Sequence, residues 1–216
     1  MPIYLPDNEL WFPAVEEALP DGLLAVGGDL NSDRLLLAYR NGIFPWYNED
    51  EPILWWSPDP RFVLFPDELK ISKSMRQVIK KQTFEFHTDT NFSDIVRNCR
   101  SVKRNCSDGT WISDEIENAY NHLHKLGHAH SAEAWCNGRL VGGLYGIILG
   151  KIYFGESMFS IEANASKFAF INLVQQLKKE GIILIDCQVY TAHLESLGAR
   201  MIPRIEFIKI LTKYAK

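Results

Sequence analysis

The chain has 216 residues, of which 46% are hydrophobic and 23% charged, and its formal net charge is −4. This composition is ordinary for a soluble globular protein, no apolar run approaches the roughly 20 residues that span a bilayer, and the first residues lack the features of a signal peptide. The length fits one large domain, or one ordinary domain with a small one. Four cysteines without a Cys-x-x-Cys pair indicate reduced thiols in a cytoplasmic protein.

Charge is distributed unevenly along the chain. Residues 1–69 hold 13 acidic and 3 basic residues, residues 70–104 hold 3 acidic and 9 basic residues, and residues 105–216 hold 11 of each. A mildly acidic protein thus contains one basic segment, which favours a local site for a polyanion.

Residues 1–60 are expected to form a small, irregular N-terminal domain rich in aromatic residues and proline. It contains one clear helix, which Asn31 or Ser32 can cap and Gly42 can end. Prolines beyond this helix preclude long regular elements. We place the boundary to a second domain, residues 61–216, near residue 61.

A basic amphipathic helix is predicted over residues 72–81, and a second helix over residues 114–126. The polar face and end of the first helix carry Lys73, Arg76, Lys80 and Lys81. Such a run is usually a solvated face. The lack of interleaved acids favours instead a contact with nucleic-acid phosphates.

The C-terminal half carries the clearest fold signal. Asn137-Gly138 is a strong hairpin turn between two alternating segments. The order β-β-β-α-β-α is that of the acyl-coenzyme A N-acetyltransferase (GNAT) fold, by analogy alone. The expected elements are strands at 129–136, 139–148 and 151–154, a helix at 165–179, a strand at 182–185, and helices at 193–197 and 204–215.

Three polar residues stand beside apolar strands. Glu156 lies in an apolar stretch, where a carboxylate is costly unless it is paired or functional; an exposed loop glutamate is the alternative. Asp186 and Gln188 end a buried strand and, being two residues apart, are expected to point to one face. There they could orient an attacking amine. The alternative is an aspartate that caps the next turn.

Four tryptophans lie in loop-like stretches: Trp46, Trp55, Trp56 and Trp111. Each could stack on an unpaired base or fill the seam between two domains. We prefer the seam for Trp55 and Trp56, and leave both readings open for Trp46 and Trp111.

Several common catalytic motifs are missing from the sequence. There is no G-x-S-x-G, Walker loop or G-x-G-x-x-G, and the histidines have no acidic or thiol partners at metal spacing, so no metal site is expected. Residues 155–167 also lack the glycine-rich cradle with which an acetyltransferase binds the pyrophosphate of coenzyme A.

Five longer motifs together are specific. They are GLLAVGGDL at 22–30, GIFPW at 42–46, WWSPDPR at 55–61, GESMFS at 155–160 and DCQ at 186–188. In this order they resemble the bacterial leucyl/phenylalanyl-tRNA–protein transferase family, over about residues 20–205. The resemblance implies a small N-terminal domain packed on a GNAT-like mixed sheet that is flanked by helices.

The resemblance also implies an activity. Such an enzyme moves Leu or Phe, and less readily Met, from aminoacyl-tRNA to proteins that begin with Arg or Lys, and so marks them for degradation. The aminoacyl ester is already activated, so no cofactor, ATP or metal is required. We expect a cytoplasmic monomer without membrane contact.

Residue roles follow by the same resemblance. Trp46 and Trp111 correspond to the adenosine platform, with Tyr39 nearby. Polar active-site groups correspond to Glu156, Asp186 and Gln188. The apolar amino-acid pocket corresponds to Tyr153, Met158, Phe170 and Ile185, although the hydroxyl of Tyr153 leaves its role the least defined.

The proton of the attacking amine can be handled in two ways. Either Gln188, backed by Asp186, acts on it, or the tRNA ribose hydroxyl does. An amide is a poor base, so we favour positioning and electrostatics for Gln188. Two rival classes are a coenzyme A-dependent N-acetyltransferase and a non-catalytic RNA-binding module.

Overall fold

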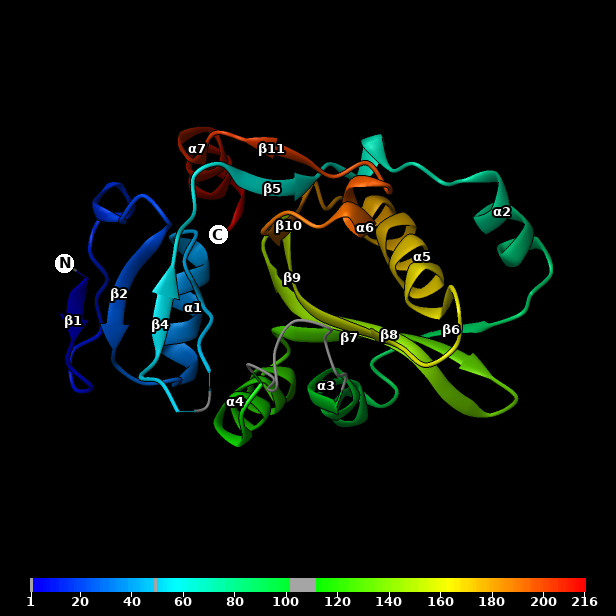
Figure 1. Cartoon of the computed structure of the whole chain (residues 1–216), viewed down its shortest axis with the longest axis horizontal. Coiled ribbons are helices and arrows are strands. Elements are labelled where there is room, and N and C mark those ends of the chain that lie inside the picture. Colours follow the sequence, from blue (N-terminus) through cyan, green and yellow to red (C-terminus); the bar gives the residue numbers. More distant parts are fainter. Residues whose placement is uncertain (1, 49, 102–111) are drawn as a thin grey trace.

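The expected α+β class is confirmed by the computed structural model, which describes residues 2–48, 50–101 and 112–216. A four-stranded sheet comes from strands before residue 57, and a seven-stranded sheet comes from strands that begin at residue 61 or later. Figure 1 shows the small sheet with α1 at one end of the molecule and the large sheet with helices on both faces. No helix within the described residues combines the length and apolar character needed to cross a bilayer.

The small sheet has the strand order β1-β2-β4-β3. Its helix α1, Ser32–Arg40, ends before Gly42, which has a positive φ of 74°. A side chain at Gly42 would lie 2.7 Å from Ile208, so glycine also allows the last helix to pack closely here. The strands are β1 Ile3–Leu5, β2 Leu23–Gly27, β3 Phe44–Pro45 and β4 Leu54–Trp56, with a 3₁₀ turn at Val15–Glu17.

The large sheet has the order β11-β5-β10-β9-β8-β7-β6. Only the central pair β9 and β10 is parallel, since α5 crosses between them, and the other pairs are antiparallel. The predicted order β-β-β-α-β-α is therefore confirmed. The strands are β5 Arg61–Leu64, β6 Glu85–Thr88, β7 Ala129–Cys136, β8 Arg139–Leu149, β9 Ile152–Ser160, β10 Leu184–Gln188 and β11 Arg200–Ile202.

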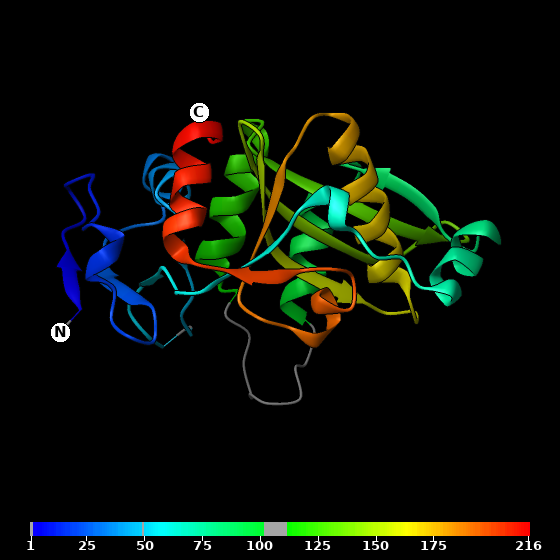
Figure 2. The same ribbon diagram turned by 90° about the horizontal axis from the view of Figure 1, so that it is seen from above.

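Helices cover both faces of the large sheet. In Figure 1, α5 lies on one face and α3 and α4 lie on the other, while Figure 2 shows α7 running beside the small sheet. Ser72 and Ser113 cap their helices by accepting hydrogen bonds from backbone N–H groups three residues on. The helices are α2 Lys73–Lys80, α3 Phe92–Ser101, α4 Asp114–Lys125, α5 Ala165–Lys179, α6 Ala192–Glu195 and α7 Arg204–Tyr214, with a 3₁₀ turn at Pro66–Glu68.

Some predicted boundaries are wrong. Strand β9 does not end at residue 154 but continues to Ser160, because a bulge accommodates Glu156 without breaking the pairing to β8. Helix α3 was not expected in the basic segment. The segment directly before it is held by β7: Glu133 accepts from the N–H groups of Thr90 and Asn91, at 2.9 and 2.8 Å. Sequence periodicity cannot show such a long-range contact.

Two apolar clusters form the core. The first joins the small sheet to α3, α4 and α7, and Trp55 is fully buried in it, with contacts to Phe12 and Gly27 of the same small unit. The second lies between α5 and the large sheet, where α2 also packs through Met75. The small sheet therefore shares one continuous core with the large one.

Candidate active site

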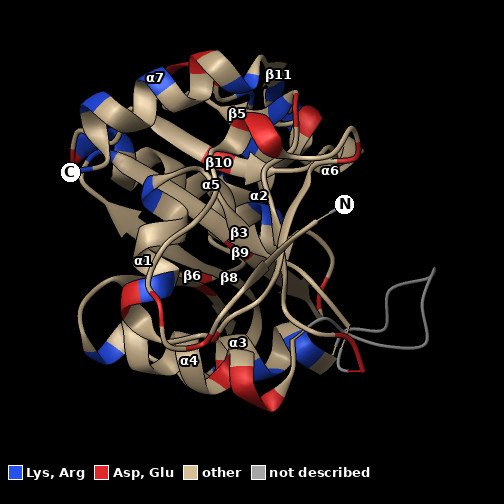
Figure 3. Cartoon of the chain, turned by 90° about the vertical axis from the view of Figure 1, so that its left-hand side faces the viewer, with Lys and Arg blue, Asp and Glu red and all other residues tan. Residues whose placement is uncertain are grey.

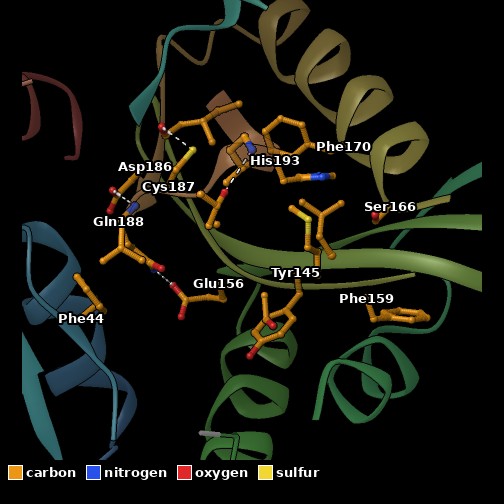
Figure 4. A pocket seen from close by; sticks show the side chains of 18 of the residues that line it. Phe44, Tyr145, Glu156, Phe159, Ser166, Phe170, Asp186, Cys187, Gln188 and His193 are labelled. Atoms are coloured by element: carbon orange, nitrogen blue, oxygen red, sulfur yellow. Dashed lines mark hydrogen bonds between the residues drawn. The ribbon is translucent and has the colours of Figure 1, made fainter. Parts of the chain in front are cut away.

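The candidate site lies where the two parallel strands separate. Pairing between β9 and β10 ends at Phe154 and Asp186, and beyond this point the strands diverge. A cavity of about 540 Å³ fills the gap (Figure 4). It is bounded by residues of the small sheet, β9, α5, β10 and α6, including Phe44, Trp46, Leu144, Glu156, Met158, Phe170, Ile185 and Gln188.

Two irregularities in the sheet turn polar groups into the gap. Tyr145 pairs with Ser157 and Gly146 with Gly155, so Glu156 is the extra residue of a bulge in β9. A second register shift in β10 lies directly before Gln188. Gln188 has a positive φ of 63° and forms the centre of a γ-turn, a strained conformation for this residue.

These irregularities bring Glu156 and Gln188 into contact. The side-chain amide of Gln188 donates to Oε1 of Glu156 at 2.9 Å, and the hydroxyl of Tyr120 donates to Oε2 at 2.8 Å. The hydroxyl of Tyr39 in turn bonds to that of Tyr120. Both tyrosines are fully buried, so the carboxylate is held by a chain of groups that cannot move freely.

The protonation of Glu156 reflects this environment. Removal from water raises the pKa of its carboxyl from 4.5 to about 7, and nearby Asp186 also raises it, while the hydrogen bonds from Tyr120, Tyr39 and Gln188 oppose the rise. Near neutral pH this carboxyl can therefore either accept or give a proton.

Asp186, which the sequence predicts to orient an attacking amine with Gln188, is paired with a cation instead. Its carboxylate is fully buried and accepts two hydrogen bonds from Arg61, at 2.8 and 2.7 Å. Arg61 also lies 4.7 Å from the ring centres of Phe44 and Phe207. Because the charge is paired and enclosed, Asp186 cannot meet an acceptor's cation in this structure. Its Oδ1 also accepts a hydrogen bond from the backbone N–H of Gln188 at 3.0 Å. This contact resembles the alternative role considered for Asp186, an aspartate that caps the next turn.

The predicted apolar pocket is brought together in part. Met158, Phe170 and Ile185 line the cavity. Tyr153 does not: it lies where β9 and β10 are still paired, it is fully buried, and its ring and hydroxyl pack against Gly146. Its placement in the pocket was therefore wrong, because the split begins only after the next residue.

Of the residues predicted at or near the adenosine platform, the structure places Trp46 at the cavity and Tyr39 away from it. Trp46 is 45% exposed and lines the cavity, with its ring centre 5.9 Å from that of Trp56. Tyr39 has no exposed surface and lies beneath Glu156, so its ring cannot stack on a base in this structure. Trp111 lies outside the described residues.

The basic residues predicted to contact phosphates are exposed, which fits a phosphate contact and a solvated face alike: Lys73, Arg76 and Lys80 of α2, and Lys81 directly after it. Figure 1 places α2 at the opposite end of the molecule from the small sheet. Lys and Arg also occur along α7 (Figure 3).

Sequence reasoning missed Arg61 and Tyr120. Tyr120 lies in the helix predicted over residues 114–126 and had no predicted role there, although a buried tyrosine hydroxyl usually has a hydrogen-bond partner. Arg61 is the last residue of the motif at 55–61, and nothing in its surroundings in the sequence predicts burial beside Asp186. No group of three or more potential metal-ligating side chains occurs in the described parts of the chain.

Comparison with known proteins identifies relatives of this chain. A model described as leucyl/phenylalanyl-tRNA protein transferase matches residues 63–212, and one for the N-terminal domain of that transferase matches residues 28–59. The leucyl/phenylalanyl-tRNA–protein transferase of Flavobacterium johnsoniae is 58% identical, over 94% of this chain and 96% of that protein. The enzyme of that name from Syntrophobacter fumaroxidans is 55% identical, over 99% and 91%.

Fold, site and relatives thus define the class: the chain is an acyl-transferring enzyme. It belongs to the leucyl/phenylalanyl-tRNA–protein transferase family.

Among solved structures, the likeness is weak. L-PGS from Bacillus licheniformis matches with a TM-score of 0.42 at 12% identity, over 78% of this chain and 53% of that one. A GCN5-related N-acetyltransferase-like protein from Streptococcus suis matches with a TM-score of 0.39 at 13% identity, over 74% and 59%.

Proposed function

We propose that the enzyme transfers leucine or phenylalanine, and methionine less readily, from aminoacyl-tRNA to the N-terminal arginine or lysine of an acceptor protein, which is thereby marked for degradation. The family assignment supports this activity. The observation that carries it is the contact between Glu156 and Gln188 at one end of an apolar cavity. Apolar walls suit the donor side chain, and the carboxylate suits the incoming amine.

Glu156 is proposed to handle the proton of that amine. An α-amino group has a pKa of roughly 8, and the pKa of Glu156 is raised to about 7, so proton transfer between them costs little. The deprotonated nitrogen attacks the ester carbonyl, the new C–N bond forms and the bond from carbon to ribose oxygen breaks. Two protons leave the nitrogen in all. Glu156 passes the first to the departing ribose oxygen, the second is released to solvent as the amide forms, and Glu156 returns to its starting carboxylate.

Gln188 and Asp186 are proposed to position the reacting groups. One N–H of the Gln188 amide holds Glu156, which leaves its carbonyl and second N–H for the substrates. Asp186 holds the backbone of Gln188 and is itself held by Arg61. Among the described residues that line the cavity, only Glu156 offers a carboxylate without a cationic partner, so it is also the residue proposed to attract the acceptor's ammonium.

Recognition of the donor is proposed to involve three surfaces. Met158, Phe170 and Ile185 hold the amino-acid side chain, and Trp46, together with Trp111, stacks on the terminal adenine. The basic face of α2 holds the acceptor arm of the tRNA. The exposure of Trp46 and of the α2 cations supports these assignments.

The domain division, the cellular location and the oligomeric state stay predictions. A division into residues 1–60 and 61–216 is supported by the separation of the two sheets at that point. Action on tRNA and newly exposed N-termini fits a cytoplasmic enzyme, which we take to be a monomer.

A product assay tests the proposed function. The enzyme is incubated with Leu-tRNA and a peptide that begins with arginine, and the peptide mass is measured. We expect the mass of one leucyl residue to be added, and RNase treatment of the tRNA to abolish the gain. A gain of an acetyl group from acetyl-coenzyme A, without tRNA, would favour the acetyltransferase alternative. If the peptide gained no mass with either donor, the result would favour a non-catalytic RNA-binding module.

A further inference from the structure

The cavity extends past the place of the reacting carbonyl. From the bulge at Glu156 to the last residue of β9, Ser160, the strand advances roughly 13 Å, at about 3.3 Å per residue. Beyond the bulge, side chains alternate, so Met158 and Ser160 share the face that α5 covers. A leucyl or phenylalanyl side chain that starts beside Glu156 covers only the Met158 part of this length.

The far end of the cavity is polar. Ser166 is in the first turn of α5, one helical turn before Phe170 and on the same face. It lines the cavity, only 8% of it is exposed, and its hydroxyl has no hydrogen-bond partner among the described residues. Figure 4 shows Ser166 and Phe170 beneath α5, with Glu156 at the other end.

A glycine in β8 allows the first turn of α5, which carries Ser166, to lie close to the sheet. Gly142 of β8 pairs with Ser160, and a side chain at Gly142 would lie 2.6 Å from Ala165 and 3.0 Å from the backbone nitrogen of Ser166. Glycine thus lets the first turn of α5 rest on the strand. Ser160 accepts a hydrogen bond from the N–H of Ser166, at 3.2 Å, which fixes the turn.

The local charges at this end favour a ligand atom with partial negative charge. The first turn of a 15-residue helix carries N–H groups with partial positive charge, it contains no acidic residue, and Lys167 adds a cation. The hydroxyl of Ser166 can donate as well. The Ser166 hydroxyl faces the cavity. A ligand atom that accepts its hydrogen bond offsets the cost of covering it, whereas an apolar atom of the same size leaves it buried without a partner, which is costly.

We propose that the far end of the cavity is a subsite for a hydrogen-bond acceptor on the donor amino acid, with Ser166 as its specificity-determining residue. The group that fits is a carbonyl, or a similar acceptor, at the para position of a phenylalanyl ring. This inference rests on the proposed function, because it assumes that the donor side chain enters the cavity from the Glu156 end.

Two donor amino acids of nearly equal shape test the subsite. Transfer RNA is charged chemically with p-acetylphenylalanine, p-isopropylphenylalanine or phenylalanine, and kcat/KM is measured for transfer to an arginine-starting peptide. The full-length enzyme is compared with Ser166→Ala. Ser93→Ala is the matched control, since Ser93 is likewise the second residue of its helix, α3, and is exposed.

The wild-type enzyme is expected to prefer the acetyl over the isopropyl compound by about 3- to 10-fold, the range of one neutral hydrogen bond. Ser166→Ala should reduce this preference to about one, and Ser93→Ala should keep it. Equal rates for both compounds in the wild type, or an unchanged preference in Ser166→Ala, would overturn the subsite alone. Failure of the wild type to transfer phenylalanine would overturn the proposed function and the subsite together.

Discussion

Gln188 Nε2 lies 2.9 Å from Glu156 Oε1, although the two residues are 32 positions apart in the chain and stand on strands that have already separated. Two strand irregularities create this contact, one at Glu156 and one directly before Gln188. In regular strands, side chains alternate strictly between the two faces of the sheet, and these two would not be turned into the gap between β9 and β10. The contact therefore depends on departures from ideal β-structure, which are common next to active sites.

Glu156→Gln is expected to lower the single-turnover transfer rate by roughly 10²- to 10⁴-fold, because the amide cannot accept the proton of the attacking amine. The affinity for aminoacyl-tRNA should stay close to that of the wild type. Because the base must be deprotonated, the wild-type rate should rise with pH through about 7 and level off above it. A glutamine variant that retains this rise would show that another group, such as the tRNA ribose, handles the proton.

The same substitution should change stability with pH. The pKa of Glu156 is raised to about 7 in the folded state, from an ordinary 4.5, so the fold favours the protonated carboxyl. Stability is fully present below the unfolded pKa and declines between about pH 4.5 and 7. Urea unfolding at pH 5 and pH 8 should show this decline in the wild type and a smaller one in Glu156→Gln. An identical pH dependence in both proteins would contradict the raised pKa.

Asp186→Asn should destabilise the fold as well as slow transfer. It leaves Arg61 as a buried charge without its partner, which typically costs roughly 3–5 kcal/mol. The double variant Arg61→Met, Asp186→Leu removes both charges and should recover part of that loss, as measured by denaturant unfolding. Transfer should stay slow in the double variant, because the backbone of Gln188 has lost its support. Recovery of both stability and rate would show that Asp186 has no positioning role.

Charge reversal on α2 tests the tRNA surface. Arg76→Glu combined with Lys80→Glu should weaken tRNA binding and flatten its dependence on salt, since fewer counterions are released. Lys209→Glu with Lys213→Glu is the matched control: it changes the net charge equally, on exposed positions of α7. Equal effects of the two pairs on affinity and salt slope would indicate a general charge effect and not a site on α2.

The sequence was sufficient for the elements whose signals are local. Asn137-Gly138 marked the hairpin, and Ser72 marked the start of α2, because each acts on its immediate neighbours. Glu156, Asp186 and Gln188 were identified because polar groups beside apolar strands are unusual, and the family resemblance strengthened them.

Features that depend on distant partners could not be predicted in this way. The pairing of Asp186 with Arg61 joins residues 125 positions apart, and neither residue signals the other. Tyr39 was placed near the adenosine platform by the family resemblance, whereas its burial depends on how α1 packs against α4. Tyr153 was misplaced for a similar reason: whether a strand residue faces a cavity depends on where two strands part, which no local pattern encodes.

Tyr120→Phe should shift the pH profile of transfer, and this is a test specific to the hydrogen-bond chain. The hydroxyl of Tyr120 donates to Oε2 of Glu156 at 2.8 Å, and that bond lowers the pKa of the carboxyl against the effect of burial. Removing the hydroxyl takes away one of the hydrogen bonds that oppose the effect of burial, so the pKa of Glu156 should rise from about 7 to a higher value. The acidic limb of the rate profile should therefore move to higher pH, while the rate on the alkaline plateau changes much less.

Tyr39→Phe provides the comparison. Its hydroxyl bonds to that of Tyr120, and its hydrogen bond to Glu156 lowers the pKa of the carboxyl by less than that of Tyr120 does, so its shift should have the same direction and a smaller size. Both variants keep the buried ring, and unfolding measurements should confirm that the fold survives. If Tyr120→Phe lowered the rate equally at every pH, its hydroxyl would serve packing or substrate contact, and the chain from Tyr39 through Tyr120 would not set the protonation of Glu156.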